Sequence, residues 1–205
     1  MNTLIIDGHP NPDSLCAAIV ARYAETNGNS AVLAVRDLHF DQNMHFGYRR
    51  RQKLEPDLER AWQLLLNADH VVVVSPIWWG SVPALLKGFF DRLLLPKRAF
   101  RIKPNGIPEG LLAARTGRVI VTTDSPWWYL RLVGDTTVRH VRQVTLRFCG
   151  IRKVRATRFG PVQSSTSEQR EGWLAKAASL GRADASRLSR RRRRTAVTEQ
   201  DAHSV

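Results

Sequence analysis

The fold is decided by the stretch Val71-Val72-Val73-Val74-Ser75-Pro76-Ile77-Trp78-Trp79-Gly80-Ser81-Val82-Pro83. Its four consecutive valines predict a strand buried on both faces, as in the middle of a parallel sheet. Ser75 and Pro76 end that strand, and Pro83 stands where a helix can begin without losing a hydrogen bond. Apolar residues at helical spacing then predict a helix with one apolar face: Val82, Leu85, Leu86, Phe89, Phe90, Leu93 and Leu94. The stretch therefore predicts a strand, an aromatic loop and a helix.

Strands and helices alternate on both sides of this stretch. Further strands are predicted at residues 3–7, 31–35, 118–122 and 153–159, and further helices at about 15–27, from Pro56, up to about Phe148, and at 168–180. This alternation predicts an α/β fold with a parallel sheet covered on both faces. Five strands fit a flavodoxin-like, doubly wound sheet of order 2-1-3-4-5.

Length and composition point to one globular domain. Of the 205 residues, 43% are hydrophobic and 24% are charged, which is ordinary for a soluble protein. We expect a domain over residues 1–181 and a basic, disordered tail over 182–205, because five arginines in a row cannot be buried. No segment resembles a membrane span or a secretory signal, so a cytoplasmic location is expected. The two cysteines form no metal-binding pattern, and no metal site is predicted.

Three loops are predicted to meet at the carboxyl ends of the strands, where ligands bind in open α/β sheets. The first contains His9 and leads through Ser14 into a helix whose amino end attracts anions. The second carries Trp78 and Trp79, and the third follows the strand that ends at residue 122. A ligand with its phosphate at the first loop and an aromatic ring between the other two would be a flavin nucleotide. Taken singly, the histidine could be only a turn residue, and the tryptophans could be rim packing or a dimer contact.

The residues of these loops resemble a known family. Residues 8–14 (Gly-His-Pro-Asn-Pro-Asp-Ser), residues 75–92 around Trp78-Trp79-Gly80, and Phe148-Cys149-Gly150 resemble the flavodoxin-like NAD(P)H dehydrogenase (quinone) family. Its relatives include the modulator of drug activity B proteins and the ancillary subunits of potassium efflux systems. The resemblance covers residues 1–181. It implies a homodimer that reduces quinones or similar acceptors by two electrons, with FMN (alternatively FAD) as cofactor and NADPH or NADH as donor.

The resemblance also implies roles for particular residues. The flavin phosphate would be surrounded by His9, Ser14, Leu15 and Cys16. The isoalloxazine ring would be held by the backbone of Pro76, Ile77, Trp78 and Trp79, and its other edge closed by Thr122, Thr123 and Asp124. Tyr129 would be the catalytic side chain, donating a hydrogen bond to the acceptor. Two departures stand out: Leu15-Cys16 replaces a common Phe-Asn, and Asp124-Ser125 replaces a pair of glycines.

Hydride transfer to the flavin and then to the acceptor, at one shared place, predicts ping-pong kinetics. Other classes of function remain open. The chain could be an ancillary subunit that binds flavin and activates a membrane transporter, or a relative that has lost its cofactor. The net charge of +14 could attract an anionic partner. Short basic tails are usually solvated, however, so nucleic acid is not the expected partner.

Overall fold

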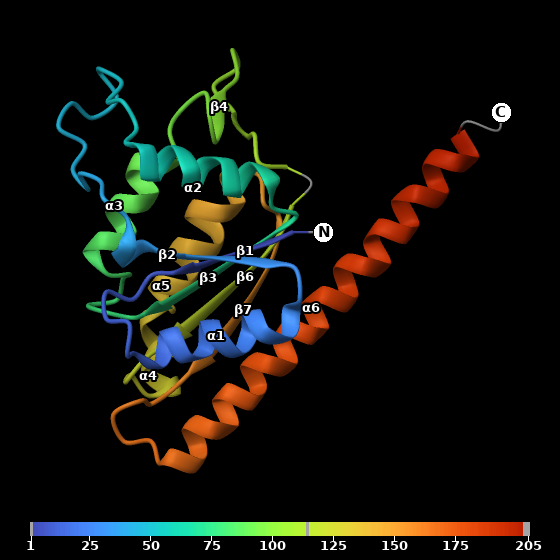
Figure 1. The fold of residues 1–205 in the computed structure, drawn as a ribbon. Helices are drawn as coiled ribbons and strands as arrows, with labels where there is room; N and C mark the ends of the chain where they lie inside the picture. Colours follow the sequence, from blue (N-terminus) through green and yellow to red (C-terminus); the bar gives the residue numbers. More distant parts are fainter. Residues whose placement is uncertain (1, 114, 203–205) are drawn as a thin grey trace.

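A sheet of parallel strands lies between layers of helices in the computed structural model, which describes residues 2–113 and 115–202 (Figure 1). The strands of this sheet are β1 (Thr3–Asp7), β2 (Ser30–Ala34), β3 (His70–Pro76), β6 (Thr116–Thr122) and β7 (Lys153–Phe159). They are parallel and lie in the order β2-β1-β3-β6-β7. Counted along the chain, this is the predicted order 2-1-3-4-5, so the predicted fold class is confirmed.

The helices follow the strands in sequence. They are α1 (Leu15–Asn27), the short 3₁₀ helix η1 (Val35–Asp37), α2 (Pro56–Asn67), α3 (Ala84–Leu93), α4 (Trp127–Val133), α5 (Thr136–Arg139), the π-helical η2 (His140–Arg147) and α6 (Ser167–Ala202). A hairpin of β4 (Phe100–Ile102) and β5 (Pro108–Gly110) lies in the segment between α3 and β6.

The core has two halves, one on each face of the sheet. Val71 and Val73 pack with side chains of α2, α3 and η2, whereas Val72 and Val74 pack with side chains of α1 and α6. All four valines are fully buried, as predicted for a central strand. Alternate residues of β3 therefore hold the two helical layers together, and the following loop starts from a rigid strand.

The chain beyond residue 181 differs from the disordered tail that we expected. Helix α6 continues through Ala202, and both Asp184 and Leu188 are buried. The carboxylate of Asp184 binds the guanidinium of Arg118 in β6, with Nε–Oδ2 and Nη2–Oδ1 distances of 2.5 and 2.9 Å. It also accepts a 2.8 Å hydrogen bond from the hydroxyl of Tyr23 in α1. This buried pairing fixes α6 beyond residue 181; residues 203–205 lie outside the described part of the chain.

One helix was expected between the third loop and Phe148, and the structure has three short segments there. Gly134 and Asp135 both adopt left-handed backbone conformations, with φ of 80° and 46°. This turn separates α4 from α5, and η2 follows directly. In the described residues, no helix is both long and apolar enough to cross a membrane.

Candidate active site

The first loop is tied to the end of β1 by the buried carboxylate of Asp7. Its Oδ1 accepts the backbone N–H of His9 at 3.1 Å, and its Oδ2 accepts from Nη1 of Arg36 at 2.6 Å. Arg36 also donates to the carbonyl of His9 at 3.1 Å. Gly8 permits this path, since a Cβ there would lie 2.4 Å from a methyl carbon of Leu86 in α3. The loop backbone is therefore fixed by Asp7 and Arg36 and by close packing at Gly8.

His9 is held as a neutral hydrogen-bond donor. Its Nδ1 accepts the N–H of Asn11 at 3.0 Å, so the proton of the neutral ring is on Nε2. Burial, partly offset by the charge of Asp7, lowers the pKa of His9 below its ordinary value. The ring also meets the indole of Trp78 edge to face, with centroids 5.6 Å apart. Loops one and two therefore touch at this pair, as predicted for neighbouring strands.

The amino end of α1 presents amides at the carboxyl end of β1. Ser14 caps the helix, and its Oγ accepts the N–H of Ala17 at 3.2 Å. The N–H groups of Leu15 and Cys16 belong to the first turn and have no acceptor within the helix. Together with the helix dipole they form a donor set for an anion such as phosphate. The Ser14 hydroxyl hydrogen is a further donor at the same place.

The side chain of Cys16 faces away from these donors. It is buried, and its Sγ lies 3.3 Å from Oγ1 of Thr122. Burial raises the pKa of this thiol to about 12, so it remains protonated. Of the predicted contacts with a phosphate, Cys16 can therefore offer only its backbone amide, while its side chain joins α1 to the end of β6.

The second loop is a tight turn with Trp79 at its tip. Trp78 and Ser81 exchange two backbone hydrogen bonds of 2.8 and 2.9 Å, and the central residues Trp79 and Gly80 have φ of 52° and 70°. Both central residues are thus left-handed, as in a type I′ turn. The N–H groups of Ile77 and Trp78 donate to the carbonyls of Thr122 and Ser81, so these two donors of the predicted backbone contact are already occupied. The Trp79 amide remains the candidate donor from this loop.

Pro76 and the third loop are also placed by the structure. Pro76 is buried within β3, where it pairs with Thr122 of β6. Thr123 is buried too, and its Oγ1 accepts the N–H of Ser125 at 3.0 Å. Asp124 is exposed but accepts the N–H of Gln163 at 2.6 Å, which ties the loop to the segment after β7. Of these residues, Thr123 lines one of the two cavities described below.

A cavity of about 450 Å³ opens between the second loop, the third loop and α5. Its lining residues are Ile77, Trp79, Gly80, Ser125, Tyr129, Leu130, Asp135, Thr136 and Thr137. Thr136 Oγ1 donates to the carbonyl of Gly80 at 2.7 Å and so joins α5 to the turn. Thr137 is 1% exposed, and its hydroxyl has no hydrogen-bond partner within the described residues. Because buried hydroxyls normally find partners, this group is a natural contact for a polar ligand atom.

A second cavity of about 450 Å³ adjoins the first and shares Ser125, Leu130 and Asp135 with it. Arg131 and Arg158 add two cationic side chains to its lining, and Arg158 forms an ion pair with Asp135. A cavity lined by the aromatic side chains of Trp79 and Tyr129, flanked by one that carries two arginines, suits a ligand with a ring at one end and an anionic group at the other.

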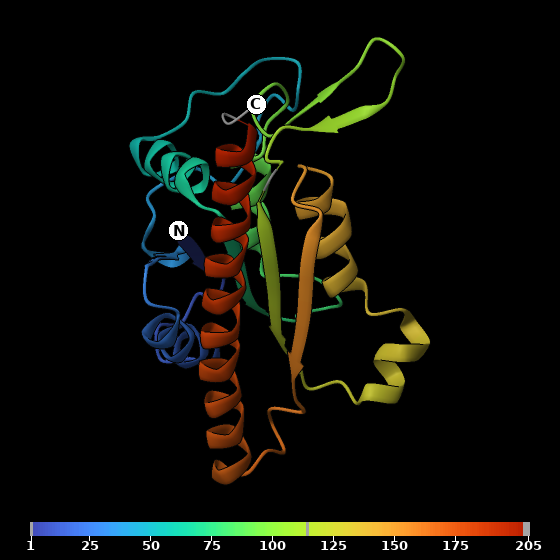
Figure 2. The ribbon, with the colours of Figure 1, turned by 90° about the vertical axis from the view of Figure 1, so that its right-hand side faces the viewer.

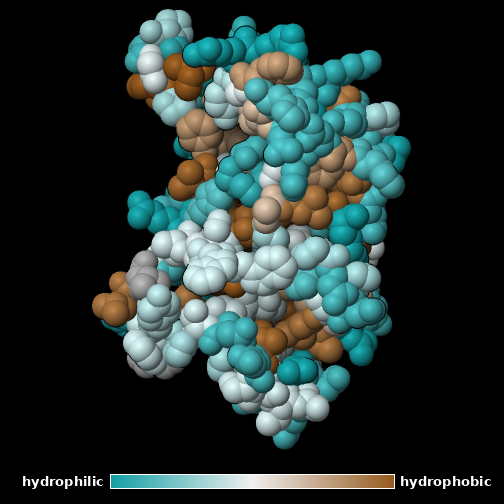
Figure 3. Space-filling model, turned by 90° about the vertical axis from the view of Figure 1, so that its left-hand side faces the viewer, coloured by the Kyte–Doolittle hydropathy of each residue, from teal (hydrophilic) through white to brown (hydrophobic). Residues whose placement is uncertain are grey.

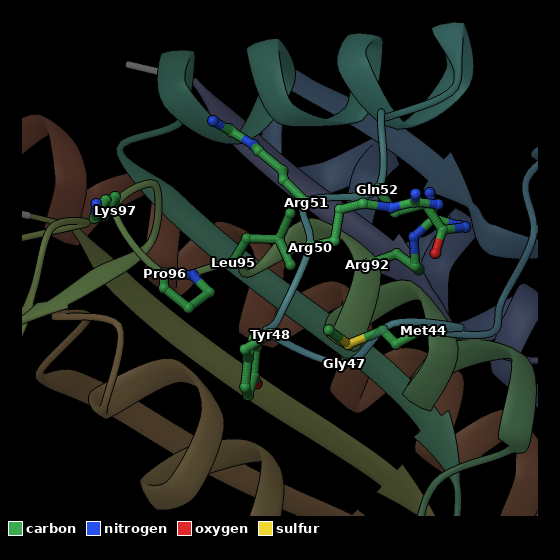
Figure 4. Close-up of a pocket in the computed structure, with 10 residues that line it drawn as sticks. All are labelled: Met44, Gly47, Tyr48, Arg50, Arg51, Gln52, Arg92, Leu95, Pro96 and Lys97. Carbon is green, nitrogen blue, oxygen red and sulfur yellow. The ribbon is translucent and has the colours of Figure 1, made fainter.

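A pocket elsewhere in the molecule serves a different purpose (Figure 4). It has a volume of about 300 Å³ and lies between residues 44–52 and the end of α3. Arg92 at its base is 1% exposed and donates to Glu55 Oε2 at 2.8 Å, to the carbonyl of Lys53 at 3.0 Å and to the carbonyl of Asp41. Because these acceptors occupy its guanidinium, Arg92 anchors the long loop after β2.

Comparison with known proteins agrees with this geometry. The model of a family described by its flavodoxin-like fold matches residues 1–180. The chain belongs to this family. A relative from Haemophilus influenzae, named an uncharacterized NAD(P)H oxidoreductase, is 29% identical over 188 residues, covering 87% of this chain and 93% of the relative. The solved structure of Smu.1420 from Streptococcus mutans UA159 matches with a TM-score of 0.81 and 28% identity, covering 89% of this chain and all of that one.

Another relative has a more specific name. The FMN-dependent NADH:quinone oxidoreductase of Stenotrophomonas maltophilia is 33% identical over 150 residues, covering 70% of this chain and 73% of the relative. The family resemblance predicted from the three loops is thereby confirmed, since flavodoxin-like oxidoreductases are what the chain matches. The roles of individual residues stay predictions.

Within this family fold, the structure brings together part of the predicted site. His9, Ser14 and the amide of Leu15 lie on one side, and Trp79 and Tyr129 lie on the other, around the strand ends. Thr136 and Thr137, which line the cavity from α5, were not among the predicted site residues. The signal that could have found them is the Gly134-Asp135 pair, because both residue types favour the left-handed turn that starts a new helix.

Proposed function

We propose that this protein is an FMN-dependent NAD(P)H oxidoreductase that reduces quinones or similar acceptors by two electrons. One observation carries the proposal: an anion-binding helix amino end and a ring-sized cavity follow neighbouring strands of one flavodoxin-like sheet. The names of the relatives from Haemophilus influenzae and Stenotrophomonas maltophilia support it.

The residues present fit a flavin mononucleotide. The amides of Leu15 and Cys16, the Ser14 hydroxyl and Nε2 of His9 are all donors, as a phosphate requires. The buried hydroxyl of Thr137 offers a polar contact inside the cavity. FMN ends at its phosphate, so it needs no further subsite, whereas FAD would also need room for an adenosine group.

The protein's part in the reaction is to position the bound cofactor, the donor and the acceptor and to stabilise them through hydrogen bonds and charge. When bound, FMN supplies two-electron chemistry, accepting a hydride from a nicotinamide and passing it on. Trp79 and Tyr129 wall the cavity in which the donor and then the acceptor would bind. Tyr129 is about half exposed and can donate a hydrogen bond to an acceptor oxygen. Arg131 is the cation we assign to an anionic group of the nicotinamide cofactor.

Steady-state kinetics test this function. Initial rates are measured with the FMN-loaded protein, NADH or NADPH as donor and a water-soluble benzoquinone as acceptor. Because donor and acceptor use one cavity in turn, double-reciprocal plots at several acceptor concentrations should be parallel. Intersecting lines would contradict the shared cavity, and a complete lack of turnover with either donor would contradict the function itself.

Replacing Tyr129 with phenylalanine should mainly affect the step that uses the acceptor. Removal of a hydrogen bond worth about 1 kcal/mol predicts a loss of roughly fivefold in kcat/KM for the quinone. The rate at which NADH bleaches the flavin in a stopped-flow experiment should stay within about twofold of the wild type. An equal loss in both half-reactions would assign Tyr129 to cofactor binding instead.

We also propose that the protein works as a homodimer through the face that carries the site. Figure 3 looks onto the side where the strands end, and residues of intermediate hydropathy spread across its middle. Several large side chains are exposed in these loops and helices: Trp78, Trp79, Trp128, Tyr129 and Leu132. Trp79 is fully exposed in a left-handed conformation that costs about 1–2 kcal/mol in a residue with a side chain. Tryptophan at such a tip fits a protein interface.

The substitution Trp79→Ser should therefore shift the protein from dimer to monomer in sedimentation velocity at micromolar concentration. Ile102→Ser is the matched control, because Ile102 is also exposed but lies in the β4–β5 hairpin. The control should sediment as the wild type does. A wild type that is monomeric throughout, or an equal effect of both substitutions, would contradict a dimer through this face.

A further inference from the structure

A groove of about 920 Å³ lies between the carboxyl-terminal half of α6 and the start of β7. Thr116 and Lys153, the first residues of β6 and β7, contribute to its lining, so it lies at the opposite end of the sheet from the candidate active site. In Figure 2, α6 runs in front of the sheet, with β6, β7 and η2 in turn to its right. The lining residues are Thr116, Arg142, Arg147, Arg152, Lys153, Val154, Arg155, Arg187, Arg190, Arg191 and Arg193.

The lining of this groove, which we call the basic groove, is almost wholly cationic. Eight of its eleven residues are arginine, one is lysine, and none is acidic. On α6, Arg187, Arg190 and Arg191 are spaced three and four residues apart, so they share one face of the helix. Residues of η2 and of the start of β7 complete the groove. Cations from three elements thus converge on one concave surface.

The position of α6 in the groove is fixed from inside the protein. Asp184 is 2% exposed and binds Arg118 of β6, and its Oδ1 also accepts from Nη1 of Arg187 at 3.0 Å. Leu188, one turn further along, is buried. The arginine face of the helix is therefore held toward β7 by packing and a buried ion pair. A solvated, disordered tail, as the sequence led us to expect, would not form such a surface.

The groove has the properties of a site for an anion. The charge of Arg187 is offset by Asp184, but no acidic residue lies in the lining itself, so the cationic side chains gathered there repel one another unless an anion binds. Within the described residues, Nε of Arg142 is buried and has no hydrogen-bond partner. Arginine is also the side chain best matched to phosphate, through its fork of N–H donors.

We propose that the basic groove binds the phosphodiester backbone of nucleic acid without reading its bases. Its concave shape fits a rod-like polyanion better than a flat bilayer. A helix that lies on a membrane needs an exposed apolar face, and Leu188, the apolar residue between Arg187 and Arg193, is buried. Aromatic side chains that would stack on single-stranded bases do not occur in the lining. Contacts would therefore go to phosphates alone, which gives strong salt dependence and little sequence preference.

Fluorescence anisotropy with the full chain and a short, labelled DNA duplex tests this proposal. The groove variant carries Arg155→Gln and Arg190→Gln, both exposed residues on facing elements. The control variant carries Arg22→Gln and Arg60→Gln, which are exposed on α1 and α2 and change the net charge equally. Neither pair belongs to the candidate active site, so NADH oxidation should be unchanged in both and report that the proteins are folded.

The wild type should bind the duplex with an affinity that falls steeply between about 50 and 200 mM NaCl. The groove variant should bind about tenfold more weakly, and its slope of log K against log salt should be shallower by about 1 to 2, or about 0.9 for each lost phosphate contact. The control variant should behave as the wild type does. Equal effects of the two variants, or no binding at about 50 mM NaCl, would overturn the proposal. So would groove-dependent binding of phosphatidylglycerol vesicles in preference to the duplex.

Discussion

Replacing Leu15 with proline is expected to weaken FMN binding by roughly tenfold to hundredfold, because a hydrogen bond to a charged group contributes about 1.5–3 kcal/mol. Leu15 is the first residue of α1, where proline removes the N–H but keeps the helical backbone. The preceding Ser14 is extended, with φ −80° and ψ 157°, which is the conformation that a following proline requires. The substitution therefore removes one proposed phosphate donor and leaves the helix in place.

Two controls make this experiment specific. Leu15→Ala removes the same side-chain contacts but keeps the N–H, so it should bind FMN almost as the wild type does. Riboflavin, which lacks the phosphate, should bind the proline variant and the alanine variant equally. Fluorescence quenching of each flavin on titration with protein gives the affinities. Equal affinity of both variants for FMN would show that this amide does not hold the phosphate.

Replacing Asp184 with alanine should lower the free energy of unfolding by about 3–5 kcal/mol, because it leaves Arg118 buried without its counter-charge. Arg118 is 3% exposed, and the hydroxyl of Tyr23 would lose its acceptor as well. Urea denaturation measures the loss. Glu168→Ala, at the exposed start of α6, is the matched control and should change stability by about 0.5 kcal/mol at most.

A double variant tests whether the unpaired charge of Arg118 causes the loss of stability. The double variant Asp184→Leu, Arg118→Met should recover much of the stability that Asp184→Ala loses, because neither buried charge of the pair is then left unpaired. If the single Asp184→Ala substitution proved as mild as the Glu168 control, the buried pair would not be what holds α6 against the sheet.

The ion pair of Asp184 and Arg118 also predicts that acid lowers the stability of the folded protein. Burial alone would raise the pKa of Asp184, but His70, whose Nε2 lies 3.5 Å from Oδ2, and the hydrogen bonds and charge of Arg118 more than offset this and hold the pKa well below its usual range. Because the unfolded carboxyl titrates near about 3.9, the folded state gains stability from the ionised form above that pH and loses it as the pH falls. The stability difference between the wild type and Asp184→Asn should therefore narrow as the pH falls from about 5 to 3. A constant difference would contradict the ionised pair.

Local patterns in the sequence were enough to predict the sheet. Several elements lie where expected, among them the strands at 3–7 and 153–159 and the helix starting at Pro56. Their signals, which are apolar runs and a proline at the helix start, depend only on residues close together in the sequence. The loops at the strand ends follow from the strand order, so the meeting of His9 with Trp78 was also predictable.

What the sequence could not predict depends on distant partners. Asp184 looked like one acid in a basic tail, and its partner Arg118 is 66 residues away. The direction of the Cys16 side chain depends on how α1 rotates against β6 once Ser14 has capped the helix. The partners of the Ile77 and Trp78 amides also depend on the fold, because the first donates to Thr122 at the end of β6 and the second to Ser81 across the left-handed turn at Trp79. Most of these contacts join residues that are far apart in the sequence, so they are determined only when the whole chain has folded.

We propose that this site binds FMN and exchanges electrons between a nicotinamide and an acceptor. The most direct test is an anaerobic absorbance titration of the purified protein after incubation with FMN and removal of the excess. We predict a retained yellow flavin spectrum that bleaches on addition of NADH or NADPH and returns on addition of a benzoquinone. A protein that stays colourless after incubation, or a bound flavin that neither donor bleaches, would contradict the account.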